Sequence, residues 1–294
     1  MKKILSLSIA LFAFVTFSFA QTAQPAESNG LLYKISGKGL EKPSYLYGTI
    51  HVICPNDMFA MDKINTHFQQ TERLILELDM DDPSIMQKMM TALNMPDGKT
   101  LKDLLAAEKY TKVDEMFKNV IGVPVAALGS INPMGLSIVI STTPKSTGCA
   151  VPASYETTFV EMATKAKMPI EGLESVEDQI AAIAKTPREK QAEDLYKLSL
   201  EPEKAVNQFK ELLTAYKTQD AEKLADYIAQ QSAENPDFQT NLLDERNKNW
   251  IPKIEKAMTE KPTFFAVGGG HLGGKTGVVK LLREKGYTVT AIKF

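Results

Sequence analysis

The chain of 294 residues contains only two cysteines, three histidines and one tryptophan, so it has few thiols and imidazoles to serve as nucleophiles or metal ligands. It contains no C-x-x-C pair, no H-E-x-x-H helix motif and no G-x-S-x-G elbow, which argues against a dithiol redox protein, a zincin and an α/β-hydrolase. Lysine and arginine (34) nearly balance aspartate and glutamate (36), for a net charge of −2. A basic surface for nucleic acid is therefore not expected.

The N-terminus is the one long hydrophobic run. Met1-Lys2-Lys3 is basic, Ile4 to Phe19 is apolar, and Ser18-Phe19-Ala20 is a small-x-small sequence before Gln21. This pattern is typical of a secretory signal peptide at residues 1–20, followed by a polar, flexible leader at 21–29. A membrane anchor is the alternative, but the apolar core is shorter than the roughly 20 residues that a span needs. We expect a periplasmic or secreted protein without a membrane span after cleavage.

The only two thiols are Cys54 and Cys149. In an oxidising compartment they can pair, so a Cys54–Cys149 disulfide is expected, with two unpaired buried cysteines as the alternative. Cys54 follows His51 by three residues, so a bridge would fix the loop beside that histidine.

Short apolar segments at both ends of the chain indicate strands, and a long region rich in Lys, Glu and Gln between them indicates helices. We predict an α/β fold: one domain at 30–294, with a mixed, largely parallel sheet built from the N- and C-terminal segments and a large helical insertion at roughly 83–260. The expected strands are residues 31–35, 45–50, 73–79, 168–174, 263–267 and 287–292, and the expected first helix is 57–70.

Two of the three histidines occupy matching frames. Gly48-Thr-Ile-His51 and Gly268-Gly-Gly-His271 each follow an apolar strand with a glycine and, three residues later, a histidine. If the two strands are parallel neighbours, both imidazoles emerge at the same carboxyl edge of the sheet. Two imidazoles and a carboxylate are a ligand set for a divalent transition metal. The alternative is that each histidine forms a structural hydrogen bond.

Glu77 is the best candidate for the third ligand. It lies within the apolar strand Leu74-Ile-Leu-Glu-Leu78, where a charge is costly unless it is paired or coordinated. The alternative is that Glu77 meets an arginine. Asp79, two residues on, is expected to support a ligand or cap the next helix, and His67 is expected to serve packing.

Three further groups are candidates for chemistry or substrate binding. Glu174 ends the fourth strand and is expected either to reach the site, as ligand or general base, or to be a helix N-terminal charge; Glu156, near a helix start, is a weaker carboxylate. Arg246 beside Asn247 is expected to clamp a substrate carboxylate or oxyanion, or to form a structural salt bridge. The backbone of Gly268–Gly270 is expected to pass close to a ligand, without the following pattern that marks a phosphate loop.

Taken in order, these motifs resemble the TraB/PrgY/GumN family, which also contains the Tiki proteins. The resemblance covers about Gly30 to Phe294. The motifs that carry it are Tyr47-Gly-Thr-Ile-His51, Leu76-Glu-Leu-Asp79, Glu171-Gly-Leu-Glu174 with Glu177-Asp-Gln179, Glu245-Arg-Asn247, Ala266-Val-Gly-Gly-Gly-His-Leu-Gly273 and Leu281-Leu-Arg-Glu-Lys-Gly-Tyr287.

The resemblance implies an α/β fold related to haem-binding ChaN-like proteins and erythromycin-esterase-like enzymes. Tiki members are described as divalent-metal-dependent proteases that use two G-x-x-H histidines and a glutamate. Those positions correspond to His51, His271 and Glu77, and the family arginine to Arg246. PrgY-like members dampen peptide-pheromone signalling by cleavage or by sequestration.

Two functions follow as hypotheses. The first is a metal-dependent hydrolase, a peptidase acting on peptides in the periplasm or outside the cell, with a divalent ion such as Mn, Co or Zn. The second is a non-catalytic protein that sequesters a peptide, haem or a metal ion. The expected partner is a peptide or small-molecule substrate, not nucleic acid, and the sequence does not indicate an oligomeric state.

Overall fold

The computed structural model describes residues 29–233 and 236–294. The expected signal peptide and nearly all of the expected leader lie outside these residues. Within the described ranges, no helix combines the length and the apolar character needed to cross a membrane.

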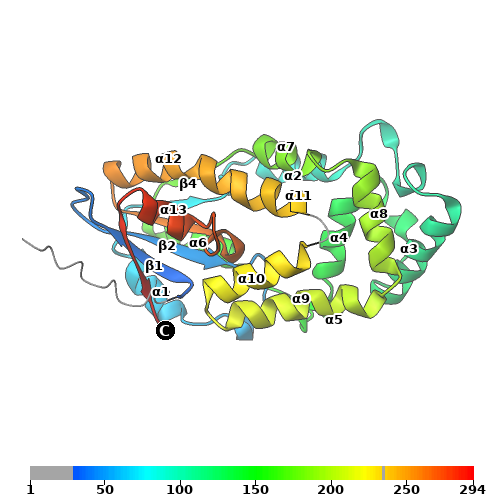
Figure 1. The fold of residues 1–294 in the computed structure, drawn as a ribbon, viewed down its shortest axis with the longest axis horizontal. Helices are drawn as coiled ribbons and strands as arrows, with labels where there is room; N and C mark the ends of the chain where they lie inside the picture. The colour runs from blue at the N-terminus through cyan, green and yellow to red at the C-terminus, as the bar shows by residue number, and fades with distance from the viewer. Residues whose placement is uncertain (1–28, 234–235) are drawn as a thin grey trace, which may run out of the picture.

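Six strands form one sheet in the order β4-β3-β5-β2-β1-β6. The four strands from β4 to β2 run parallel to their neighbours, whereas β1 pairs antiparallel with both β2 and β6. The predicted mixed, largely parallel sheet is therefore confirmed (Figure 1), with five strands from the two ends of the chain and β4 from within the predicted helical insertion. The strands are β1 (Leu32–Ser36), β2 (Ser44–Thr49), β3 (Arg73–Leu76), β4 (Ile170–Gly172), β5 (Thr263–Gly268) and β6 (Thr288–Ile292).

The central strand β5 lies between β2 and β3. Thr49 is paired with Gly268 across β2 and β5, and Leu76 with Ala266 across β3 and β5. All residues of β2 and β3 are buried, because a strand at the centre of such a sheet is covered on both faces. The carboxyl ends of three neighbouring parallel strands thus meet at one edge of the sheet.

Two predicted boundaries were wrong. Strand β3 ends at Leu76, so Glu77 and Asp79 lie beyond the strand and not within it. The reason is that β5 turns away at Gly268, whose backbone N–H donates to the Glu77 carboxylate (2.7 Å) in place of a strand partner. The helix expected at 57–70 is a 3₁₀ turn at Pro55–Asp57 followed by a helix that begins only at Met61.

Helices fill most of the rest of the chain, and several of them begin at a proline, which fits the first turn of a helix. Helices α1 and α6 cover one face of the sheet, where Phe68 and Phe159 each lie 5.1 Å from the ring of Phe264, and α12 and α13 pack together over the sheet (Figure 1). The longer helices are α1 (Met61–Phe68), α2 (Ile85–Leu93), α3 (Ala107–Val120), α4 (Pro133–Ser141), α6 (Tyr155–Ala166), α7 (Val176–Ala184), α8 (Arg188–Ser199), α9 (Pro202–Lys217), α10 (Ala221–Gln231), α12 (Glu245–Glu260) and α13 (Val278–Glu284). The short helices are α5 (Pro144–Thr147) and α11 (Pro236–Gln239), and a π-helical turn, Thr240–Asp244, leads into α12.

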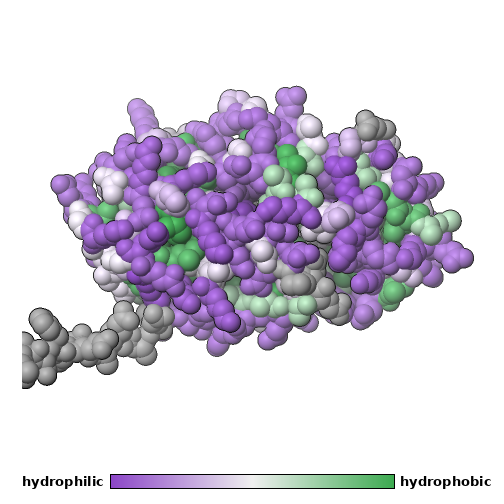
Figure 2. All heavy atoms as spheres, turned by 45° about the horizontal axis from the view of Figure 1, so that its top comes forward, coloured by the Kyte–Doolittle hydropathy of each residue, from purple (hydrophilic) through white to green (hydrophobic). Residues whose placement is uncertain are grey.

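The helical region has a hydrophobic core of its own. Helices α3, α4, α8 and α9 pack around buried residues that include Val113, Phe117, Leu136 and Leu195. They form a lobe at the end of the molecule away from β1 and β6 (Figure 1). Figure 2 shows a mainly hydrophilic face on which apolar side chains form small separate patches.

Candidate active site

Three functional candidates converge where the parallel strands end. A Cβ atom built on Gly268 would lie 3.1 Å from Oε1 of Glu77, 3.6 Å from Cδ2 of His271 and 3.8 Å from Nε2 of His51. The structure thus brings the two histidines and Glu77 together around a residue that has no side chain. A larger residue at position 268 would fill the space between them.

His51 is held by a carboxylate from a distant segment. Its Nδ1 lies 2.8 Å from Oε1 of Glu156, at the start of α6. The same carboxylate accepts hydrogen bonds from the hydroxyls of Thr49 (2.5 Å) and Ser154 (2.7 Å). The Glu156 side chain is 12% exposed, whereas that of His51 is 68% exposed. Glu156 therefore orients His51 from inside the protein and leaves Nε2 on the side of Gly268.

His271 is held by an amide. Its Nδ1 lies 2.6 Å from Oδ1 of Asn247, and the Asn247 amide nitrogen donates to the carbonyl of Thr276 (2.9 Å). An amide oxygen can only accept, so these partners assign the Nδ1–H tautomer and leave the Nε2 lone pair for the cleft. The His271 side chain is 5% exposed, and its ring centroid lies 4.4 Å from that of Trp250.

The two histidines have pKa values displaced in opposite directions. Desolvation by the surrounding protein opposes a charge on His51 although its side chain remains accessible to water, but the hydrogen bond and the charge of Glu156 outweigh it and raise the pKa of His51 to about 9. Burial lowers the pKa of His271 to about 3; the charge of Glu77 opposes this shift, and the charge of Arg246 adds to it. Burial would raise the pKa of Glu77, yet the histidines and Arg246 lower it to about 2. Without a bound cation, the site at neutral pH thus holds a charged His51, a neutral His271 and an ionised Glu77.

Arg246 joins the site from the first turn of α12. Its NH2 donates to Oε2 of Glu77 (2.5 Å) and to Oε1 of Glu174 (2.6 Å), and its NH1 lies 3.2 Å from Nε2 of His271. NH1 also donates to the carbonyl of Leu242 (2.7 Å). A structural salt bridge for Arg246 and an arginine partner for Glu77 were the alternatives considered from the sequence. The ion pair between Arg246 and Glu77 satisfies both.

Glu174 reaches the site only through Arg246. Its backbone N–H donates to the carbonyl of Glu77 (3.0 Å), and its side chain is 5% exposed. One carboxylate oxygen accepts from Arg246, and the other accepts from Arg246 Nε (3.2 Å) and from Nε1 of Trp250 (2.9 Å). Both oxygens are therefore occupied by donors of the protein itself.

The donor set suits a divalent transition metal. Both Nδ1 atoms are engaged by acceptors, as is usual for metal-ligating histidines, so each Nε2 is the available ligand atom. Oε1 of Glu77, 3.7 Å from Nε2 of His271, supplies the hard oxygen ligand. As the side chains are placed within residues 29–233 and 236–294, no group of three or more His, Cys, Asp or Glu residues could hold a metal ion, so the three donors would have to move together to bind one. Arg246 NH1 lies 3.2 Å from Nε2 of His271, where a metal would bind. If a metal occupied this Nε2, NH1 would keep its hydrogen bond to the Leu242 carbonyl.

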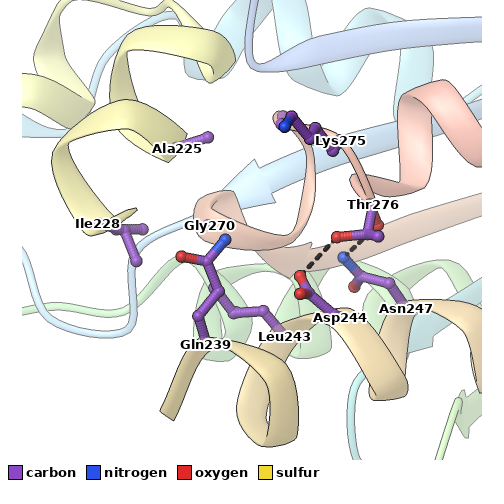
Figure 3. Close-up of a pocket in the computed structure, with 11 residues that line it drawn as sticks. Ala225, Ile228, Gln239, Leu243, Asp244, Asn247, Gly270, Lys275 and Thr276 are labelled. Atoms are coloured by element: carbon purple, nitrogen blue, oxygen red, sulfur yellow. Dashed lines mark hydrogen bonds between the residues drawn. The ribbon is translucent and has the colours of Figure 1, made fainter. Parts of the chain in front are cut away.

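Residues Gly268–Gly270 lie between the cluster of His51, His271 and Glu77 on one side and helix α10 on the other. Cβ atoms built on Gly269 and Gly270 would lie 2.8 Å from Leu224 and 2.7 Å from Ile228, so a side chain at either position would displace the ends of these α10 side chains. A small pocket lies beside this segment, between Ile228 of α10, Leu243 and Asp244 at the start of α12, and Thr276 (Figure 3). Thr276 donates to Asp244 across it.

The remaining candidates lie outside the cluster. His67 packs its ring 4.9 Å from that of Tyr45 on the surface of α1. Asp79 is half-buried in the turn after Glu77, and burial together with Asp81 raises the pKa of Asp79 to about 6.

Glu156, which contacts His51, was the weakest of the carboxylates considered from sequence, because a glutamate beside a Ser154 N-cap is usually an ordinary charge of the first helical turn.

Cys54 and Cys149 form a disulfide with a Cα–Cα distance of 5.9 Å and a separation of 95 residues. Beside it, Ile53 and Ala153 form an antiparallel bridge through two backbone hydrogen bonds. These contacts join the loop that carries His51 to the segment that leads into Glu156. The disulfide thus lies next to the His51–Glu156 pair.

Comparison with known proteins gives a family and distant relatives. The model of the TraB/PrgY/gumN family matches residues 31–291. Metalloprotease TIKI1 of Danio rerio is 22% identical over 85% of this chain and 61% of its own length. Metalloprotease TIKI1 of Homo sapiens is 31% identical over 31% of this chain, and the match spans 17% of that protein. The chain thus spans less than two thirds of these relatives. No solved structure matches it.

Proposed function

Because this chain belongs to the TraB/PrgY/gumN family, we propose that it is a metal-dependent hydrolase that cleaves peptides. The similarity to proteins named metalloproteases supports a protease chemistry. The observation that carries the proposal is the pair of histidines whose Nδ1 atoms are both engaged, with each Nε2 facing the same space beside Glu77. Histidines that served packing alone would not need such matched orientation.

In this proposal His51, His271 and Glu77 hold the ion. When bound, a divalent metal polarises a carbonyl and lowers the pKa of a coordinated water. Glu156 keeps the Nδ1 proton of His51, and Asn247 keeps that of His271, so both Nε2 atoms stay directed at the cleft. Both oxygens of Glu174 are engaged, so its role in the proposal is to hold Arg246 rather than to accept a proton.

Arg246 is proposed to stabilise negative charge on the substrate. Its guanidinium contacts both Glu77 and His271, so a carbonyl oxygen bound between them lies within reach of a permanent positive charge. The backbone of Gly268 to Gly270 borders the same space without side chains, which lets an extended peptide approach closely. A divalent ion such as Mn, Co or Zn matches the mixed imidazole and carboxylate donors.

The test is a peptide-degradation assay on the mature chain. Protein treated with a chelator is compared with the same protein resupplied with Mn²⁺, Co²⁺ or Zn²⁺, and products are identified by mass spectrometry. Loss of cleavage with chelator and recovery with one ion supports the hydrolase. Tight peptide binding without any product, with or without metal, would instead support the sequestering protein.

We propose further that the chain is exported and cleaved after Ala20. The basic, apolar and small-x-small segments at residues 1–20 support this, as does the disulfide, which an oxidising compartment would preserve. N-terminal sequencing of protein from the native host should begin at or near Gln21. An intact Met1 in a soluble cytoplasmic fraction would contradict the proposal.

A further inference from the structure

Trp250 is the only tryptophan of the chain, and it is fully buried beneath the site. It lies on α12 one turn after Arg246. Its Nε1–H donates to Glu174 (2.9 Å), its ring lies 4.9 Å from the guanidinium carbon of Arg246, and its centroid lies 4.4 Å from that of His271. A single side chain thus contacts three members of the cluster without facing the cleft itself.

Arg246 and a bound cation would compete for the same atoms. The guanidinium lies against Oε2 of Glu77 and Nε2 of His271, which are the groups that would take a metal. On its other side the guanidinium is tethered to Glu174 by Nε and NH2. Because Arg246 already contacts Glu77 and His271, a cation can bind only if the guanidinium withdraws, and the strength of its tether to Glu174 decides how readily it does so.

Glu174 depends on Trp250 for its orientation. Apart from Arg246, the indole N–H is the side-chain donor to this buried carboxylate in the described residues. A hydrogen bond to a charged, buried group is stronger than one between neutral groups, so its loss frees the carboxylate to turn. If the Glu174 carboxylate is free to rotate, it no longer draws the Arg246 guanidinium away from Glu77 and His271.

We propose that Trp250 is a positioning residue: by fixing Glu174 it gives Arg246 a partner toward which the guanidinium withdraws from Glu77 and His271, and so sets the affinity of the site for a divalent cation. The proposal rests on the metal-dependent function proposed above. It adds a role for a residue that touches neither substrate nor ion. It also makes the intrinsic fluorescence of the chain a reporter of this one position.

The test is a double-mutant cycle with Co²⁺ affinity as the readout. Binding is followed by the visible absorption of Co²⁺ and by quenching of the tryptophan fluorescence in proteins that keep Trp250. Trp250→Phe should weaken Co²⁺ binding by tenfold to a hundredfold, the range seen when groups that orient metal ligands are removed. Arg246→Met should not weaken it, because the competing cation is gone.

The decisive measurement is Trp250→Phe in the Arg246→Met background. If Trp250 acts by restraining Arg246, the indole matters little once the guanidinium is absent, and the double variant should bind Co²⁺ within about threefold of Arg246→Met. An equal loss in both backgrounds would overturn the proposal, because Trp250 would then act on His271 directly. An unchanged affinity in Trp250→Phe would overturn it as well.

Two controls separate this role from general stability. Phe159→Leu changes a fully buried aromatic residue of the same core that does not contact the cluster, and it should leave Co²⁺ affinity unchanged. If Trp250→Phe does not fold, replacing tryptophan biosynthetically with benzothienylalanine exchanges the one indole N–H for sulfur and keeps the ring shape. That protein should show the same loss. Wild-type protein that binds no Co²⁺ would instead refute the metal-dependent function.

Discussion

The two G-x-x-H segments have the same spacing and lie on neighbouring strands, yet their histidines have opposite environments. His51 is mostly exposed and pairs with a carboxylate, whereas His271 is buried and pairs with an amide. The pKa of the first is raised and that of the second is lowered. The frame therefore decides only where each imidazole emerges, whereas the charge of His51 depends on Glu156 and the neutrality of His271 depends mainly on burial.

The largest expected effect comes from removing either imidazole. His51→Ala and His271→Ala should each abolish metal-dependent peptide cleavage, as should Glu77→Gln, because each removes a ligand of the proposed ion. The comparison predicts that pH separates them: His271→Ala leaves a cavity in the buried site and lowers Tm, whereas His51→Ala lowers Tm by removing the cation beside Glu156, and this second loss should disappear above pH 9. Calorimetry beside the cleavage assay checks both. Equal Tm changes at every pH would mean that the two environments matter equally to the fold.

Opening the disulfide should disturb one histidine more than the other. Cys54→Ser with Cys149→Ser removes a bridge across 95 residues, for which chain entropy predicts a loss of at most about 4–5 kcal/mol in the free energy of unfolding. The His51 imidazole NMR signal should broaden or shift, and that of His271 should not, because the bridge lies beside the His51–Glu156 pair. Denaturant unfolding measures the stability. Two titratable thiols in unreduced, denatured wild-type protein would contradict the bridge itself.

Removing the partners should cost less than removing the histidines. Glu156→Gln removes the negative charge from the Nδ1 acceptor of His51, and Asn247→Leu removes the Nδ1 acceptor of His271; each should weaken metal affinity by about tenfold to a hundredfold. Glu156→Gln should also bring the pKa of His51 down, since the carboxylate raises it, and leave His271 unchanged. An NMR titration of both imidazoles provides the measurement. A His51 pKa that does not fall would refute the assigned cause.

Without metal, stability should change with pH in opposite directions for the two histidines. His51, raised to about 9, contributes stability that is fully present below pH 6.5 and is lost as pH rises through 9. His271, lowered to about 3, stays neutral while the unfolded chain takes up a proton, so stability falls as pH drops below 6.5. These two groups alone therefore place the maximum near pH 6.5. Urea unfolding of chelator-treated protein across pH measures it, and His51→Ala should remove the alkaline decline.

The smallest effect is expected at the third histidine. His67 packs against Tyr45 and has no contact with the cluster, so His67→Ala should leave cleavage and metal affinity unchanged and lower stability only slightly. The same assays apply, which makes this variant a control for the loss of an imidazole as such. A loss comparable to that of His51→Ala would show that cleavage responds to fold stability rather than to the site.

The sequence predicted what repeats locally and missed what depends on long-range contacts. The G-x-x-H frames placed His51 and His271 at one edge on the condition that their strands are parallel neighbours, and β2 and β5 are paired in this way in the structure. Glu156 was only a weaker candidate carboxylate and could not be identified as the partner of His51, because it lies 105 residues away and resembles an ordinary charge at a helix start. The contact of Arg246 with both Glu77 and Glu174 likewise depends on how α12 packs over the sheet, which no local pattern determines.

The position of β5 in the sheet constrains how the chain can be made. This strand joins β3 to β2, yet it begins at Thr263, so the ribosome has synthesised nearly everything else before the two halves of the sheet can be connected. Until then the β1–β2 hairpin and the β3–β4 pair expose edges and apolar faces that only the last segment covers. An N-terminal fragment therefore lacks both the central strand and His271, and the cluster of His51, Glu77 and His271 can form only after β5 has been synthesised.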